Sequence, residues 1–323
     1  MFKRILVPLD GSGRAERALP VAARLARASG GTIFLVRVLS TATASMPTAP
    51  ARPLLIQTVG EADRIQAESY LRGVADSEML AGLSVQTEIP VGLVSPSILT
   101  TAAVKHADII IMCSHGYTRV KNWMMGSVAA KIARYSQVPV LVLRDGGPLS
   151  LPKERHTVED QLRVLVPLDG SDNARAAIGP AVQFAAALSA PGGAVLHLLH
   201  VVQSGYEVSV ANRTMHAARN TQADTNMAKE YLDATIRQLR DDSTGNGLSD
   251  LNLMLTSSVI TGEDIARGII NAAESNGDGA FGGYDVVAMT TQGYGGPQRW
   301  IGSVTERVLD TSRLPLLIVR PGE

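Results

Sequence analysis

Several features that common protein functions require are scarce in this chain of 323 residues. It has one cysteine, Cys113, so it can form neither an intrachain disulfide nor a zinc site built from several cysteines. Four Phe, seven Tyr and two Trp provide few rings for stacking on bases, and 30 Lys and Arg are balanced by 30 Asp and Glu. Because a net charge of zero does not attract a phosphate backbone, we expect no nucleic acid among the partners.

Long apolar runs are missing as well. No uncharged stretch reaches the roughly 18 residues that a membrane span needs, and Met1–Asp10 loses its apolar character too early for a signal peptide. We therefore expect a cytoplasmic protein without a membrane partner. With 45% hydrophobic and 19% charged residues, the chain can bury a full core, and its length favours two domains.

What the sequence does contain is an internal repeat. Arg4–Ser12 returns as Arg163–Ser171 with eight identities in nine positions. Two further segments match in the same order: Gly126–Val128 with Gly302–Val304, and Val138–Arg144 with Leu314–Arg320. The offset grows from 159 to 176, so the second copy is 17 residues longer. We predict two copies of one domain, at 1–147 and 160–323, joined by a linker rich in Pro, Gly and charge at Arg144–Gln161.

Each copy alternates short apolar runs with longer amphipathic ones. In the first copy the pattern predicts strands at Arg4–Leu9, Thr32–Val38, Ser84–Ile89, Asp108–Cys113 and Val138–Leu143. It predicts helices at Arg14–Ser29, Thr58–Leu80, Ser95–Lys105 and Gly126–Tyr135. Nearly continuous apolar strands indicate a parallel sheet covered on both faces, and thus a doubly wound α/β domain. Such a sheet binds ligands beyond the carboxyl ends of its strands.

Three prolines constrain this interpretation. Pro8 and Pro167 fit a central strand only at its last residues, because proline donates no ladder hydrogen bond. Pro20 falls inside the first predicted helix and is expected to kink it.

The first candidate site is the turn after the first strand of each copy, Asp10–Ser12 and Asp169–Ser171. A carboxylate at this edge can accept hydrogen bonds from ribose hydroxyls or an adenine amino group. Glycine then allows the sharp turn, and serine can cap the next helix. The alternative is an ordinary turn followed by a helix cap, without a ligand.

The second candidate site is a loop after the fourth strand, bracketed by two glycines. In the first copy these are Gly116 and Gly126, and in the second Gly293 and Gly302. Backbone N–H groups can approach an anion closely at such a loop, and the helix that follows presents its positive end. The alternative is a surface loop with a serine at the helix start.

Other residues have plainer interpretations. We interpret Cys113 as a small core thiol rather than a redox sensor. His115 could contact phosphate. His197 and His200 are three apart on a strand, so they face opposite sides and cannot share a metal ion.

Taken together and in this order, the segments Val-Pro-Leu-Asp-Gly-Ser, Gly-x9-Gly-Ser-Val and Val-Pro-Val-Leu-Val-Leu resemble the universal stress protein family. The resemblance occurs twice and covers the chain outside the linker. It implies a five-stranded parallel sheet of order 3-2-1-4-5 in each domain. It also implies a pseudo-twofold pairing of the two domains through their last strands, Val138–Leu143 and Leu316–Val319.

The resemblance also implies an adenine-nucleotide site in each domain, with ATP as the ligand and Mg²⁺ as its potential companion. In the first domain its residues are Pro8, Asp10, Val38, Met112, Cys113, Gly116, Gly126, Ser127 and Val128. In the second they are Asp169, Val201, Thr290, Gly293, Gly302, Ser303 and Val304. Both copies depart from the family pattern, because Cys113 and Thr290 replace its first glycine. The second loop is also one residue shorter, so the first site is expected to be the more competent one.

The function implied is that of a regulatory ATP-binding protein of the stress response, with at most slow hydrolysis and no assigned catalytic or metal-binding residue. Two alternatives stay open. One is a nucleotide-free interaction scaffold of the same family. The other is an enzyme of the adenine-nucleotide α-hydrolase group, although Asp10–Arg14 and Asp169–Asn173 do not match the motifs of such enzymes. A homodimer of the tandem chain also stays open.

Overall fold

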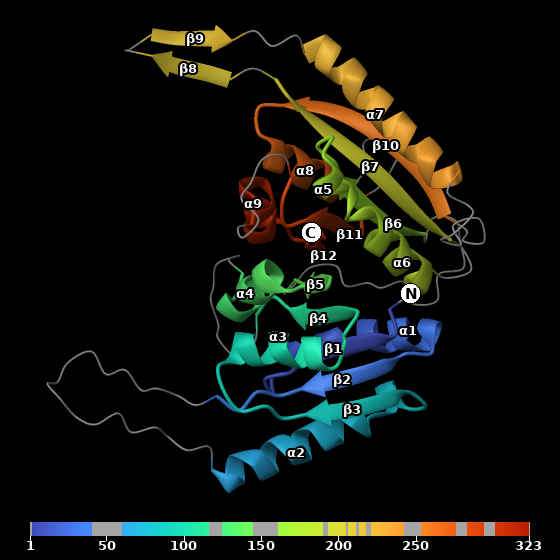
Figure 1. The fold of residues 1–323 in the computed structure, drawn as a ribbon, viewed down its shortest axis with the longest axis vertical. Helices are drawn as coiled ribbons and strands as arrows, with labels where there is room; N and C mark the ends of the chain where they lie inside the picture. The colour runs from blue at the N-terminus through green and yellow to red at the C-terminus, as the bar shows by residue number, and fades with distance from the viewer. Residues whose placement is uncertain are drawn as a thin grey trace, which may run out of the picture. The chain divides into compact units, whose positions relative to one another are not determined.

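The computed structural model describes residues 2–40, 60–115, 125–144, 161–189, 193–204, 206–210, 213–217, 221–241, 253–275, 283–293 and 301–322. Gly116, the interior of the predicted linker and most of the segment after the second strand lie outside these ranges. Each repeat has strands and helices of its own, and the two repeats are described in turn (Figure 1).

The first repeat contains a sheet of five strands. They are β1 (Arg4–Pro8), β2 (Thr32–Val36), β3 (Ser84–Glu88), β4 (Ile109–Cys113) and β5 (Val140–Leu143). Their order is β3-β2-β1-β4-β5, and β1 pairs in parallel with both β2 and β4. This confirms the expected order, whose direction reverses between β1 and β4.

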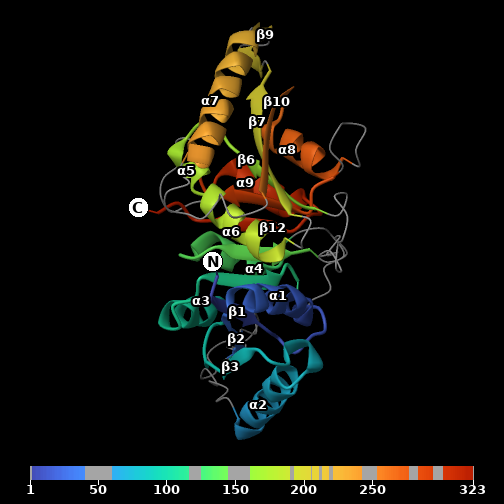
Figure 2. The ribbon, with the colours of Figure 1, turned by 90° about the vertical axis from the view of Figure 1, so that its right-hand side faces the viewer.

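Helices cover both faces of this sheet. They are α1 (Leu19–Ser29), α2 (Glu61–Ala75), α3 (Val94–Val104) and α4 (Ser127–Tyr135). Helices α1 and α2 lie on one face, and α3 lies on the other with α4 packed beside it (Figure 2). Short 3-10 turns, Ala15–Ala18 and Glu78–Leu80, precede α1 and follow α2.

The second repeat has the same plan. Its strands are β6 (Leu162–Pro167), β7 (Ala194–Gln203), β10 (Leu253–Gly262), β11 (Val286–Thr290) and β12 (Leu316–Val319), in the order β10-β7-β6-β11-β12. Its helices are α5 (Asp172–Arg175), α6 (Ile178–Leu188), α7 (Thr221–Asp241), α8 (Ile265–Glu274) and α9 (Ser303–Thr311). Two further strands, β8 (Tyr206–Val210) and β9 (Arg213–Ala217), form a separate antiparallel pair. The second repeat is longer than the first, and comparison of the strand registers places most of its additional residues between α7 and β10 and between α8 and β11.

The apolar strands form the core of each repeat. Ile109, Ile110 and Ile111 of β4 are fully buried, which confirms the expectation of a sheet covered on both sides. The structure also corrects some predicted limits. Strand β2 ends at Val36, so Val38 lies in the connection that follows it.

The prolines fit the sheet as their chemistry requires. Pro8 and Pro167 are the last residues of β1 and β6, as expected. The prediction that Pro20 kinks a long helix is wrong. The segment begins as a 3-10 turn and becomes α-helical at Leu19, so Pro20 lies in the first turn of α1. An N–H group in the first turn has no partner within the helix, and proline therefore costs nothing there.

His197 belongs to a buried polar group in the second sheet. It is 3% exposed, and its Nδ1 and Nε2 lie 2.8 Å from Oγ1 of Thr256 and Oγ of Ser258. The ring of Tyr284 lies 5.5 Å away. Burial, together with the charge of Arg163, lowers the pKa of His197 to about 4. Both ring nitrogens therefore serve to join β7 to β10.

No helix in the described part of the chain is long and apolar enough to cross a membrane.

Candidate functional site

The turn after β1 is held by the side chain of Asp10. Its Oδ1 accepts hydrogen bonds from the backbone N–H of Ser12 at 2.9 Å and from the Ser12 hydroxyl at 2.6 Å. The Ser12 hydroxyl oxygen in turn accepts from the N–H of Ala15 at 3.3 Å. Gly11 between them has a φ of 89°, a conformation that favours glycine. The predicted glycine turn is therefore confirmed, and Ser12 bonds to the first N–H group of the 3-10 turn Ala15–Ala18.

The second repeat reproduces this turn. Oδ1 of Asp169 accepts from the N–H and the hydroxyl of Ser171 at 2.9 and 2.6 Å. Ser171 caps α5 by accepting from the N–H of Ala174 at 3.1 Å, and Gly170 again has a φ of 89°. Both carboxylates thus have a structural role, and both also line a cavity.

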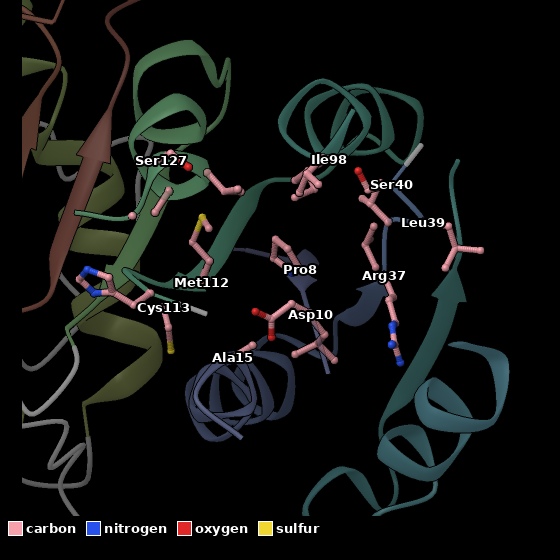
Figure 3. Close-up of a pocket in the computed structure, with 18 of the residues that line it drawn as sticks. Pro8, Asp10, Ala15, Arg37, Leu39, Ser40, Ile98, Met112, Cys113 and Ser127 are labelled. Carbon is pink, nitrogen blue, oxygen red and sulfur yellow. The ribbon is translucent and has the colours of Figure 1, made fainter. Parts of the chain in front are cut away.

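The cavity of the first repeat opens where the sheet order reverses. It encloses about 750 Å³, within the usual range for small-molecule sites. The carboxyl ends of β1, β2 and β4 form its floor, and the starts of α3 and α4 form part of its wall. Figure 3 shows the Asp10 carboxylate, Met112 and Ser127 around one space. The two candidate segments of this repeat, which are distant in sequence, therefore meet at one cavity.

Helix α4 presents its N-terminus to this cavity. Gly126, which precedes it, donates its N–H to the carbonyl oxygen of Ser114 at 2.9 Å. A Cβ atom on Gly126 would lie 2.6 Å from that same oxygen, so the close approach of the two backbones requires glycine. No side chain of the described residues caps α4, and Ser127 and Val128 of its first turn line the cavity. A helix start of this kind carries a positive potential that favours anions.

His115 lies beside this helix start and also lines the cavity. Its Nδ1 is 3.1 Å from the Ser114 hydroxyl. Its Nε2 is buried, without a hydrogen-bond partner among the described residues.

A charged cluster on the opposite side of the cavity was not predicted from the sequence. Arg37 follows β2, and its guanidinium lies 4.9 Å from the ring centre of Tyr70 on α2. The Tyr70 hydroxyl donates to Oε1 of Glu16 at 2.8 Å. Burial and the Glu16 carboxylate raise the pKa of Tyr70. In Figure 3 the Arg37 side chain extends away from Ser127, toward the edge of the cavity farther from α4.

The second repeat has a cavity of about 640 Å³ at the equivalent place. It is lined by every residue that the sequence placed in this site: Asp169, Val201, Thr290, Gly293, Gly302, Ser303 and Val304. The Thr290 hydroxyl donates to the carbonyl oxygen of Gln292 at 2.7 Å, and so bonds to its own loop. A Cβ on Gly293 would clash with Oδ2 of Asp169, so the carboxylate packs directly against this glycine.

The first cavity likewise brings together the described residues of its predicted site. Pro8, Asp10, Val38, Met112, Cys113, Gly126, Ser127 and Val128 all line it, whereas Gly116 lies outside the described residues. Sequence reasoning missed Arg37 and Tyr70 in the first repeat and Tyr231 in the second. One signal was available, because Ala67, Tyr70 and Leu71 match Ala228, Tyr231 and Leu232 in identity and spacing.

A tandem pair of doubly wound α/β domains, each with a cavity where its strand order reverses, is thus the class of protein that the fold defines. A model of the universal stress protein family matches residues 1–144 and again 162–320. The chain therefore belongs to the universal stress protein family, with two copies of its domain.

Individual relatives agree with this assignment. A universal stress protein of Methanocaldococcus jannaschii is 25% identical over 145 residues, which cover 45% of this chain and 83% of that protein. Universal stress protein YxiE of Bacillus subtilis is 27% identical over 150 residues, 45% of this chain and all of that protein. The crystal structure of a universal stress protein from Archaeoglobus fulgidus covers 99% of this chain and 97% of its own, with a TM-score of 0.62 and 20% identity. At that identity the likeness concerns the fold.

Proposed function

We propose that this protein binds ATP in the cavity of the first repeat and acts as a cytoplasmic regulatory protein of the stress response. The observation that supports this most directly is the position of Asp10 and the start of α4 at one cavity. A carboxylate suits ribose hydroxyls, and an uncapped helix start suits phosphates. One nucleotide carries both ribose hydroxyls and phosphates, so a single ligand can contact Asp10 and the start of α4 together.

In this proposal ATP is a ligand rather than a rapidly consumed substrate. Its binding favours one conformation or one partner of the protein, and hydrolysis is slow. Among the described residues no group of three His, Cys, Asp or Glu side chains is arranged to hold a metal ion. Mg²⁺ would accordingly enter coordinated by the phosphates of the nucleotide, with Ser127 as a neighbouring hydroxyl.

The experiment is a calorimetric titration with Mg-ATP of the wild-type chain, Asp10→Asn and Asp10→Ala. Asparagine keeps an oxygen that can accept from Ser12, so Asp10→Asn should preserve the turn but lose the charge that attracts ribose hydroxyls. We expect its affinity to fall about tenfold or more, as for the loss of a hydrogen bond to a charged group.

Thermal unfolding of the same samples separates the two roles of Asp10. Asp10→Ala should lose both affinity and melting temperature, whereas Asp10→Asn should lose mainly affinity. An unchanged dissociation constant for folded Asp10→Asn would exclude Asp10 as a ligand of ATP. Native mass spectrometry of the purified wild-type protein provides a direct check, since retained nucleotide appears as added mass.

A further inference from the structure

The two cavities differ at one equivalent position. In each repeat the proline that ends the first strand pairs with the residue immediately before Arg37 or His200. The strand register therefore makes His200 the counterpart of Arg37. Both residues line their cavities, so a permanent cation in the first is replaced by an imidazole in the second.

The surroundings of this position differ as well. His200 packs edge-on against Tyr231 of α7, with ring centres 6.4 Å apart, where Arg37 packs against Tyr70. Glu16, which accepts from the Tyr70 hydroxyl, corresponds to Arg175 in the second repeat. Arg175 cannot accept a hydrogen bond, and it donates instead to Oε1 of Gln238.

Two polar atoms are left buried by this change. The hydroxyl of Tyr231 and Nδ1 of His200 are buried and make no hydrogen bond of ordinary geometry among the described residues, although the Thr235 side chain lies close enough to the Tyr231 hydroxyl to affect its pKa. Leaving such groups unpaired is costly, and a ligand that bonds to them recovers that cost. Because both residues line the second cavity, their unmet capacity indicates a ligand with a polar edge at this place.

The charges that the described residues place around the second cavity disfavour an anion. Its described lining residues include Asp169 and Asp224 but neither Lys nor Arg. The Asp169 carboxylate packs against Gly293. Burial lowers the pKa of His200, a change that Asp169 opposes, and this lowering favours the uncharged imidazole. Met227, Ile265 and Ile269 add apolar walls.

We propose that the second cavity binds an uncharged heteroaromatic ligand of the nucleoside class, not a nucleoside triphosphate. The polar edge of its base bonds to His200 and Tyr231, and its sugar hydroxyls face Asp169. This inference rests on the proposed function, because it takes the cavity at the strand ends to be a nucleotide-type site. It adds that the two repeats select different ligands.

Methionine methyl groups allow both cavities of the intact chain to be observed separately. Met112 lines the first cavity, and Met227 and Met289 line the second. In a chain labelled with ¹³C-methyl methionine, assigned through Met→Leu variants, adenosine and Mg-ATP are titrated in parallel. We expect adenosine to shift Met227 and Met289 at concentrations about tenfold below those of ATP, because the described lining of this cavity has no cation equivalent to Arg37 to offset its carboxylates. Equal or tighter binding of ATP at these two methyl groups, or no response to adenosine, would overturn the proposal.

A matched pair of variants tests the role of the tyrosine hydroxyl. Tyr231→Phe removes the unpaired hydroxyl, and we expect about three- to tenfold weaker adenosine binding at Met227 and Met289. Tyr70→Phe removes a hydroxyl already bonded to Glu16 and should leave adenosine binding in the second cavity unchanged. If both variants weakened it equally, the effect would be one of general stability and the proposal would fail.

A third variant, and the Met112 signal, complete the test. His200→Arg places the cation of the first cavity in the second, and we expect the preference there to move from adenosine toward ATP. No change in preference would contradict the role assigned to His200. The proposed function is judged separately, since it fails if ATP leaves Met112 unshifted. Adenosine binding that depends on Tyr231 would still support the second-cavity proposal in that event.

Discussion

The hydroxyl of Tyr70 donates a 2.8 Å hydrogen bond to Oε1 of Glu16, and this bond joins the middle of α2 to the 3-10 turn that precedes α1. The same tyrosine carries the Arg37 guanidinium over its ring. One side chain therefore connects three segments around the edge of the first cavity.

The bond between Tyr70 and Glu16 should contribute to stability. We expect Tyr70→Phe to lower the free energy of unfolding of the first repeat by about 1 kcal/mol, a usual value for one hydrogen bond. Urea unfolding at pH 8 measures this change. A variant as stable as the wild type would show that water replaces the bond without loss.

The same residue predicts a dependence on alkaline pH. Because the pKa of Tyr70 is raised in the folded state, the folded protein keeps a proton that the unfolded chain releases above about pH 10. Stability should therefore be intact below pH 10 and fall as the pH rises further. The fall should be smaller in Tyr70→Phe, although not abolished, since burial also raises the pKa values of Tyr231 and Tyr284. Identical profiles for the two proteins would contradict this assignment.

His197 predicts the opposite dependence in the second repeat. Its pKa is lowered from 6.5 to about 4, so the folded state excludes a proton that the unfolded chain binds. Stability from this group is complete above pH 6.5 and is lost as the pH falls toward 4, by about 3 kcal/mol in total. Amide hydrogen exchange in β7 and β10, measured between pH 7 and 4.5, reports the free energy of unfolding and tests this prediction. His197→Gln should flatten the profile in that window.

The two glycines before α4 and α9 should respond differently to the same change. A Cβ at position 126 meets the Ser114 carbonyl oxygen at 2.6 Å, whereas a Cβ at position 302 meets that of Thr291 at 3.5 Å, an ordinary contact. We expect Gly126→Ala to cost about 1–3 kcal/mol and to weaken ATP binding, and Gly302→Ala to be tolerated. The melting temperature and the ATP affinity of each variant are measured. Equal losses in Gly126→Ala and Gly302→Ala would show that the backbone at Gly126 relaxes without cost.

The pairing of the two domains stays a prediction. The last strands, Val140–Leu143 and Leu316–Val319, are entirely apolar, and an uncovered apolar edge strand is prone to aggregation. We expect the halves to form a compact pair in solution. Small-angle scattering from two well-separated lobes would exclude it.

Much of the fold could be predicted because its determinants are local. The repeat identifies equivalent segments, apolar runs identify the strands, and the turn at Asp10 depends on neighbours in the chain. Pro20 was misjudged because proline disrupts the interior of a helix but fits its first turn, and the periodicity did not show where the α-helix begins. The end of β2 at Val36 was missed because Val38 and Leu39 are also apolar, and Leu39 still forms an isolated bridge with Val91.

The described residues of the predicted site were found together, but their surroundings were not foreseen. Arg37 and Tyr70 belong to a strand end and a later helix, and they meet only because α2 packs on the sheet. Their difference from His200 and Tyr231 depends on Glu16 and Arg175, which are contributed by a third segment. Contacts that need three separate elements cannot be read from spacing along the chain.

The exchange of Arg37 for His200 has a consequence for how such a protein can evolve. In a dimer of identical single-domain chains, every substitution in one cavity also appears in the other. Here the two repeats are encoded separately within one chain, so a change at one cavity leaves the other untouched. Covalent linkage also fixes the two cavities at a one-to-one ratio at any protein concentration. If the proposed ligands bind, a single polypeptide with unlike cavities responds to two of them at once. A symmetric pair of identical domains presents a single kind of site and responds to one.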